Sequence, residues 1–109
     1  MAKLSSVVDT KNIPPGMLLR VFDMPGDDDP VAPFAVSHWS LERGADSGDD
    51  LHGAREMWLI AAGRGQMTCG GASTELAAGD VVSIESNQPH RVMNSGDSPF
   101  EVFSVWWPS

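Results

Sequence analysis

Short apolar stretches, separated by turns rich in glycine and proline, run along most of the sequence, and this pattern constrains the fold more than any other feature. The stretches alternate in polarity or are rich in strand-forming residues, and none has a convincing helical periodicity. The expected strands lie at residues 17–22, 34–41, 56–61, 64–69, 73–76, 81–84, 90–93 and 100–107. With 11 glycines and 8 prolines available for turns, this regular spacing predicts an all-β sandwich or barrel.

The segments before and between these strands carry predictions of their own. Residues 63–65, Gly-Arg-Gly, indicate a hairpin turn between two of the strands. Residues 23–33 form a loop, and its aspartate run at 27–29 lacks the spacing of a calcium-binding EF-hand, which favours a solvated acidic turn. Residues 1–12 form a polar arm that is either loose or adds a strand to a neighbouring subunit. Residues 13–109 then form one β-barrel domain.

Charge and composition exclude several classes of partner. The formal net charge is −8 and the seven basic residues form no cluster, which disfavours binding to nucleic acid. The start of the chain lacks the apolar core of a signal peptide, and no apolar run approaches the roughly 20 residues that span a membrane. Cys69 is the only cysteine, so no intramolecular disulfide can form. We expect a soluble, cytoplasmic protein that binds neither nucleic acid nor membrane.

Acidic and histidine side chains gather in two segments that each begin at a glycine. Asp50 and His52 are two residues apart, so an extended chain would point both toward one face, and Glu56 follows with the same parity. His90 begins a strand in the second segment. Imidazole and carboxylate together suit divalent Fe, Mn, Ni, Co or Zn. His52, Glu56 and His90 alone would form a two-histidine, one-carboxylate set that leaves coordination positions open for a substrate.

The spacing of these residues resembles the two sequence motifs of the cupin superfamily. From Gly44 to Gly63 the chain reads G-x5-D-x-H-x3-E-x6-G, which is similar to the first motif, G-x5-H-x-H-x3,4-E-x6-G. From Gly79 to Asn94 it matches the glycine, histidine and asparagine of the second motif, G-x5-P-x-G-x2-H-x3-N. Asp50 replaces the first histidine, and Glu-Ser-Asn replaces P-x-G. The resemblance implies a single-domain double-stranded β-helix, also called a jelly-roll barrel.

The resemblance also implies a site for a divalent metal ion such as Fe, Zn, Mn or Ni. By motif position, its ligands would be Asp50, His52, Glu56 and His90. Asp50 is shorter than the histidine it replaces. It would therefore either bind the metal, orient His52, or accept a proton from substrate. Asp50 and Glu56 are accordingly the candidate catalytic residues.

Other side chains are candidates for the walls of the pocket or for a subunit contact. The expected pocket residues are Trp58, Ile60, His38 and Arg91. Trp58 and Ile60 share the parity of Glu56 and would face the same interior. Met57 and Leu59 have the opposite parity and would lie on the outer surface of the sheet, which favours a homodimer.

These observations favour a metal-dependent enzyme that acts on a small molecule, in natural-product or amino-acid metabolism. The reaction would be either an iron-dependent oxygenation or Lewis-acid chemistry, such as isomerisation, cyclisation or a condensation that forms an N–N bond. The alternatives are a non-catalytic ligand-binding or sensing module and an accessory subunit of a larger enzyme. The interior distinguishes them, because an enzyme needs a wet cavity beside the metal whereas a docking subunit would have a filled barrel.

Overall fold

The computed structural model describes residues 3–25, 33–50 and 52–108, and within them the chain forms antiparallel strands and no helix. The predicted all-β fold is therefore confirmed. The strands are β1 (Ser6–Asp9), β2 (Met17–Phe22), β3 (Ala35–Leu41), β4 (Arg55–Ala62), β5 (Arg64–Cys69), β6 (Ala72–Ala77), β7 (Val81–Ile84), β8 (His90–Asn94) and β9 (Phe100–Trp107). The aspartate run at 27–29 lies outside the described residues. None of the described segments is a helix long and apolar enough to cross a membrane.

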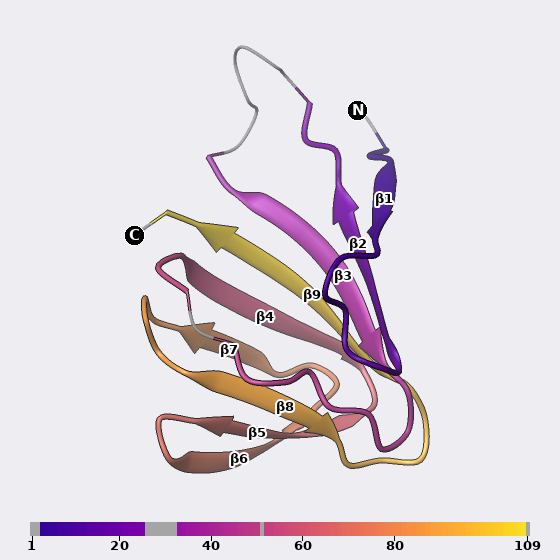
Figure 1. Cartoon of the computed structure of the whole chain (residues 1–109), viewed down its shortest axis with the longest axis vertical. Helices are drawn as coiled ribbons and strands as arrows, with labels where there is room; N and C mark the ends of the chain where they lie inside the picture. Colours follow the sequence, from indigo (N-terminus) through magenta and orange to yellow (C-terminus); the bar gives the residue numbers. More distant parts are fainter. Residues whose placement is uncertain (1–2, 26–32, 51, 109) are drawn as a thin grey trace.

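The strands form two sheets in the arrangement of a jelly roll. The larger sheet has the order β1-β2-β3-β9-β4-β7, and the smaller has the order β6-β5-β8. Figure 1 shows β1 and β2 at one edge of the larger sheet, with the smaller sheet at the bottom of the view. The C-terminal strand β9 lies between β3 and β4, so the last strand of the chain joins the N-terminal half of the larger sheet to its other half.

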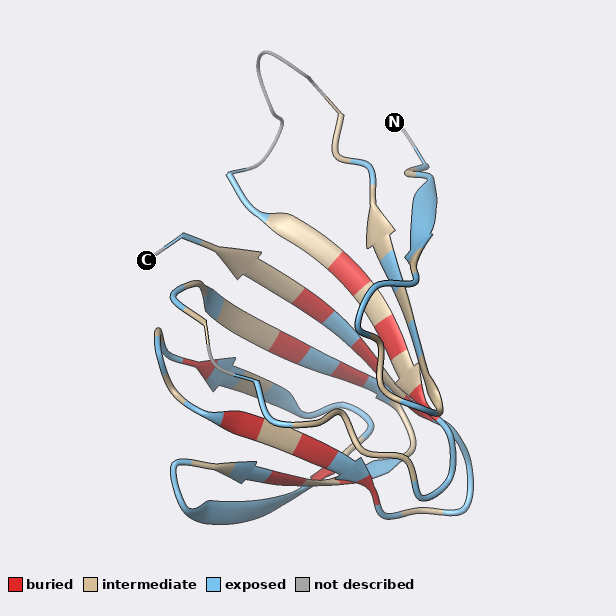
Figure 2. Ribbon diagram, viewed as in Figure 1, coloured by how far each residue is buried: buried red, intermediate tan, exposed pale blue. Residues whose placement is uncertain are grey.

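The core lies between the two sheets because side chains alternate along each strand. Figure 2 shows this alternation as buried bands separated by more exposed residues along β3, β4, β8 and β9. The buried apolar side chains are Trp39, Leu41, Trp58, Ile60, Met67, Leu76, Ile84, Val92, Phe100 and Val102. Burial of each large side chain stabilises the fold by about 1.5–3 kcal/mol.

The expected hairpin at residues 63–65 is wrong. β4 pairs with β7 and β9, whereas β5 pairs with β6 and β8, so the chain passes from one sheet to the other at Gly63. Both edges of β4 are occupied by other strands, which leaves no edge for β5. Gly63 has φ +83°, and a Cβ there would lie 2.4 Å from the carbonyl oxygen of Pro99. Only glycine fits this crossing.

The N-terminal arm differs from the first of the two expectations for it, that of a loose segment. Its apolar piece forms β1, which pairs with β2 of the same chain, with Val7 opposite Val21 and Val8 opposite Arg20. This segment is therefore not loose, and its contact with a neighbouring subunit stays a prediction. It becomes the edge strand of the larger sheet.

The outer face of the larger sheet is apolar near its centre. Leu59 is 40% exposed there and lies opposite Phe103 and Val81 on the neighbouring strands. Met57 lies on the same face, opposite Val105. This placement agrees with the parity read from the sequence. The homodimer expected from it stays a prediction.

Candidate metal centre

Asp50 reaches the histidines because its backbone pairs with that of His90. The Asp50 N–H donates to the His90 carbonyl at 2.9 Å, and the His90 N–H donates to the Asp50 carbonyl at 3.0 Å. This bridge draws the segment before β4 alongside β8. This bridge holds the side chain of Asp50 beside the two histidines.

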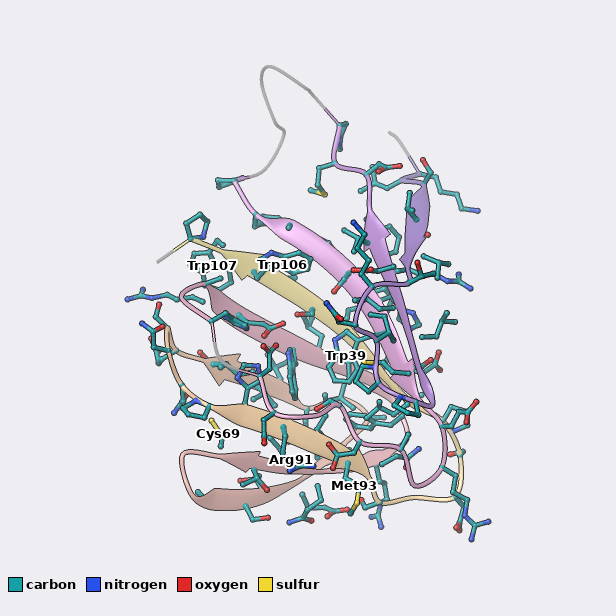
Figure 3. All side chains as sticks on the ribbon, in the orientation of Figure 1. Trp39, Cys69, Arg91, Met93, Trp106 and Trp107 are labelled. Atoms are coloured by element: carbon teal, nitrogen blue, oxygen red, sulfur yellow. The ribbon has the colours of Figure 1, made fainter. Side chains whose placement is uncertain are left out.

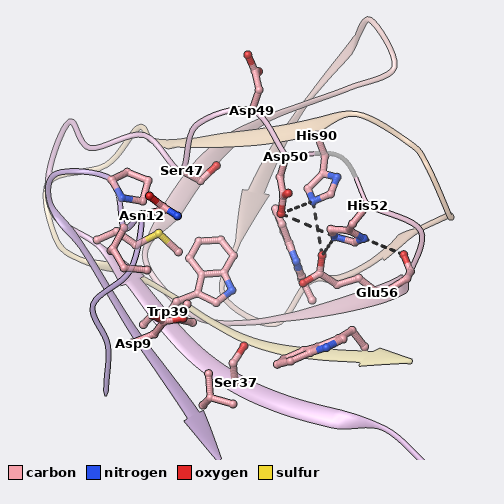
Figure 4. Close-up of a pocket in the computed structure, with 18 residues that line it drawn as sticks. Asp9, Asn12, Ser37, Trp39, Ser47, Asp49, Asp50, His52, Glu56 and His90 are labelled. Atoms are coloured by element: carbon pink, nitrogen blue, oxygen red, sulfur yellow. Dashed lines mark hydrogen bonds and ion pairs between the residues drawn. The ribbon is translucent and has the colours of Figure 1, made fainter. Parts of the chain in front are cut away.

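Four side chains from the two motifs converge, as Figure 4 shows. The Asp50 Oδ2 atom lies 3.6 Å from His90 Nε2 and 3.8 Å from His52 Nε2. The ligand atoms of these three residues all lie within 4.8 Å of one another. Glu56 Oε1 lies 3.2 Å from His52 Nε2 and 3.5 Å from His90 Nε2, although Glu56 is outside that mutually close triad.

Backbone carbonyls orient both imidazole rings. His52 Nδ1 lies 2.9 Å from the carbonyl oxygen of Ala54, and His90 Nδ1 lies 2.8 Å from that of Gln88. A carbonyl oxygen can only accept, so each Nδ1 carries the proton and donates it. In the neutral rings, both Nε2 lone pairs then face the carboxylates.

The arrangement fits a divalent metal ion. Metal–ligand bonds of about 2.0–2.2 Å place neighbouring donors about 3.0–3.4 Å apart in tetrahedral or octahedral geometry. The nitrogen–oxygen distances of 3.2–3.8 Å between the histidines and the carboxylates lie in or just above that range. Two imidazoles and two carboxylates are also a donor set that first-row transition metals accept.

Glu56 is the buried carboxylate of the cluster, with its side chain 13% exposed. The Ser104 hydroxyl donates to its Oε2, which leaves Oε1 facing the histidines. Burial alone would raise the pKa of Glu56. Hydrogen bonding from His90 and Ser104, together with the charge of His90, outweighs burial, so its pKa lies below the usual value. The Trp58 N–H points to the same effect on the Glu56 carboxylate, although it makes no hydrogen bond to any described residue.

The pKa of His90 is shifted by the same contacts. Burial lowers the pKa of its ring, but the hydrogen bonds to Glu56 and to the Gln88 carbonyl act in the opposite direction. The charges of Glu56 and Asp50 add to those bonds, so the pKa of His90 lies above its usual value. Glu56 and His90 therefore stabilise each other's charged forms.

An open cavity of about 570 Å³ lies beside the cluster, and all four of its side chains line it. Trp58 lines it as well, as its parity predicts. Three other predicted pocket residues do not. Ile60 is 4% exposed and packs in the core; it lies two residues after Trp58 on the same face of β4.

His38 and Arg91 have the wrong parity to reach the cavity. His38 lies on the outer face of β3, where its Nε2 is 3.4 Å from Glu101 Oε1 and its ring packs on Phe103. Arg91 follows His90, so it points to the other face of β8. There it donates to Asp46 at 2.6 Å.

Sequence reasoning missed much of the cavity wall. Trp39 and Trp106 line it, and Trp39 also belongs to the buried core; Figure 3 shows them on β3 and β9. Ser37 also lines it, and Ser104 supports Glu56 from behind. The two serines are polar residues at inward positions of apolar strands, and this signal was available in the sequence.

Comparison with known proteins agrees with this arrangement. The cupin domain family matches residues 37–106. A Cupin 2 conserved barrel domain protein from Salinispora arenicola is 31% identical, with a TM-score of 0.74 over 85% of this chain and 76% of that chain.

Two more distant solved structures share the fold. A predicted oxalate decarboxylase from Thermotoga maritima is 22% identical, with a TM-score of 0.72 over 94% of this chain and 99% of that chain. A Cupin_2 domain of an XRE family transcriptional regulator from Enterobacter cloacae is 20% identical, with a TM-score of 0.70 over 86% and 98%. The fold therefore serves proteins of different kinds, and it does not decide function by itself. The family match, the two motifs and the two-sheet fold together establish that this chain belongs to the cupin family.

Proposed function

We propose that the chain is a metal-dependent enzyme that acts on a small molecule. The observation that carries this proposal is the convergence of Asp50, His52 and His90 at the wall of an open cavity of about 570 Å³. A cavity of this size lies within the range of small-molecule sites. An accessory subunit that only docks would need no such space, so the cavity favours a small-molecule role.

The roles follow from position and exposure. His52 and His90 would hold the metal through Nε2, because their Nδ1 atoms are engaged with backbone carbonyls. Asp50 and Glu56 would supply oxygen ligands. A bound metal would supply either Lewis-acid activation of a substrate oxygen or, as iron, redox chemistry.

The chain's own side chains would control protons at the site. The Asp50 side chain is 61% exposed and borders the cavity, so it is the carboxylate best placed to accept a proton from a substrate. Ser104 would hold the second oxygen of Glu56, which keeps that carboxylate turned toward the histidines. Trp58 would shield one side of His90 from water, because the two rings lie 5.7 Å apart in an edge-to-face arrangement.

The test is the metal content of untagged protein, measured by elemental analysis after purification and after reconstitution. We expect close to one divalent ion per chain in the wild type and in His38→Ala, the matched control for loss of a histidine outside the site. His90→Ala should lose the metal. His52→Ala, at a position that is 30% exposed, provides a second variant if removal of buried His90 impairs folding.

The identity of the metal then selects the reaction class. Iron directs the search to oxygen-consumption assays with small-molecule panels, whereas zinc or manganese favours Lewis-acid reactions. Wild-type protein that binds no metal even after reconstitution would overturn the enzyme proposal and leave a cupin used for ligand binding.

A further inference from the structure

The charges around the cavity point to the chemical class of its ligand. Resting on the proposed function, we propose that this ligand is a small amine that carries a positive charge on an apolar, preferably aromatic, body. Small anions, including dicarboxylates, would be excluded. The proposal is built from the charged groups of the cavity, its aromatic wall and the location of every basic residue.

Carboxylates line the cavity, and the basic side chains among its described lining residues are the two histidines of the cluster. Asp9, Asp49, Asp50 and Glu56 are among the lining residues. All seven Lys and Arg residues fall within the described part of the chain, and none of them lines this cavity. An anionic substrate would therefore meet no Lys or Arg side chain in the described walls, and the two histidines there would be engaged by the metal.

The charge balance stays unfavourable to anions with a metal in place. Asp50 and Glu56 would offset the two positive charges of a divalent ion. Arg91 Nη1 lies 3.5 Å from Asp49 Oδ1 and offsets that charge. Asp9 remains, and the only contact described for its side chain is the N–H of Lys11, donated at 2.9 Å. The loaded cavity would thus keep a net negative charge on the side formed by the N-terminal segment.

The rest of the wall suits an apolar cation. Trp39, Trp58 and Trp106 line the cavity, and the first two rings meet edge-to-face with centroids 5.1 Å apart. Indole faces attract ammonium groups, and the attraction is stronger in sites from which water is excluded. In Figure 4, Trp39 stands between the labelled N-terminal residues and the cluster, where a ligand body would contact it.

The test uses two probes with the same body and opposite charge, phenethylamine and 3-phenylpropionate. Binding to the full-length chain is measured by calorimetry and by quenching of tryptophan fluorescence, in metal-free and in zinc-loaded protein. We expect phenethylamine to bind at least about tenfold more tightly than 3-phenylpropionate in both forms. Asp9→Asn should reduce this preference severalfold. Asp23→Asn, which removes the same charge from an exposed residue outside the cavity, should leave it unchanged.

The outcomes separate this proposal from the one on which it rests. Equal or tighter binding of 3-phenylpropionate in either form overturns the amine proposal, as does absence of phenethylamine binding at millimolar concentration. The measurement on metal-free protein does not depend on whether a metal binds. If the protein failed to take up metal, the enzyme proposal would be overturned. The preference for the amine over the carboxylate could still be measured on the metal-free protein.

Discussion

Removal of the Asp50 carboxylate tests most directly whether this departure from the family motif belongs to the metal site. Asp50 Oδ2 lies 3.6 Å from His90 Nε2 and 3.8 Å from His52 Nε2. These distances are short enough for one metal ion to bind all three residues. We expect Asp50→Ala to weaken metal binding by about 100-fold, at the upper end of the effects seen on loss of supporting groups around metals. The folded structure should survive, because the side chain is 61% exposed.

The expected size of the effect follows from binding linkage. A metal present at 100 times its dissociation constant stabilises the wild-type fold by about 2.7 kcal/mol. For a domain of this length that corresponds to a rise in Tm of about 11–22 °C. If Asp50→Ala raises the dissociation constant 100-fold, the same metal concentration contributes only about 0.4 kcal/mol, or about 2–3 °C.

The assay is thermal unfolding of metal-free protein titrated with zinc, manganese or iron under anaerobic conditions. Asp49→Ala is the matched control, because it removes the neighbouring acidic charge from a side chain that is 83% exposed and outside the metal triad. We compare the metal-induced rise in Tm, so any effect of either mutation on the metal-free fold cancels. A rise in Asp50→Ala as large as that in Asp49→Ala would refute the reasoning and leave Asp50 as a base or orienting group.

Two further predictions concern the fold. Gly63→Ala should destabilise the protein by at least about 2 kcal/mol more than Gly71→Ala in chemical denaturation. Both glycines have positive φ, but an added Cβ lies 2.4 Å from the Pro99 carbonyl oxygen only at Gly63 and has nothing within 4 Å at Gly71. Equal losses would show that the backbone at the crossing relaxes. Burial raises the pKa of Asp46, but hydrogen bonds from Arg91 and the backbone, with the charge of Arg91, lower it below the usual 3.8. The resulting stability is present above that value and is lost as pH falls through the folded-state pKa. Asp46→Asn should therefore lower Tm by a few degrees at pH 7 and progressively less below pH 4, and a difference independent of pH would contradict the assignment.

Much of the strand pattern was predictable because it is local. Residues 100–107 and 81–84 form strands with the predicted bounds, since runs of β-branched and aromatic residues next to turn signals fix an extended chain. The partner of each strand was not predictable in the same way. In the sequence, residues 63–65 look like a hairpin turn. The chain crosses to the other sheet there because β7 and β9, which are distant in sequence, already pair with both edges of β4.

The candidate site divides along the same line. The spacing of His52, Glu56 and His90 in the two family motifs identified the cluster, although His52 precedes β4 and His90 lies on β8 in the other sheet. Parity along β3 and β9 could have placed His38 on the outer face and Ser104 on the inner face, but the contact of Ser104 with Glu56 depends on the pairing of β9 with β4. Nothing local indicated that Asp9 and other N-terminal residues would wall the cavity, since that contact depends on β1 pairing with β2.

The sequence by itself determined the family, the strands and the identity of the histidines and carboxylates that meet. These rest on short-range spacing, which a single chain displays directly. Only the tertiary structure decided that Asp50 reaches the cluster, because its backbone pairs with His90 from the other motif. It likewise decided that tryptophans and carboxylates wall the cavity, with no Lys or Arg among the described lining residues. Such a surface is assembled from segments far apart in the chain, and their meeting is set by the packing of the two sheets.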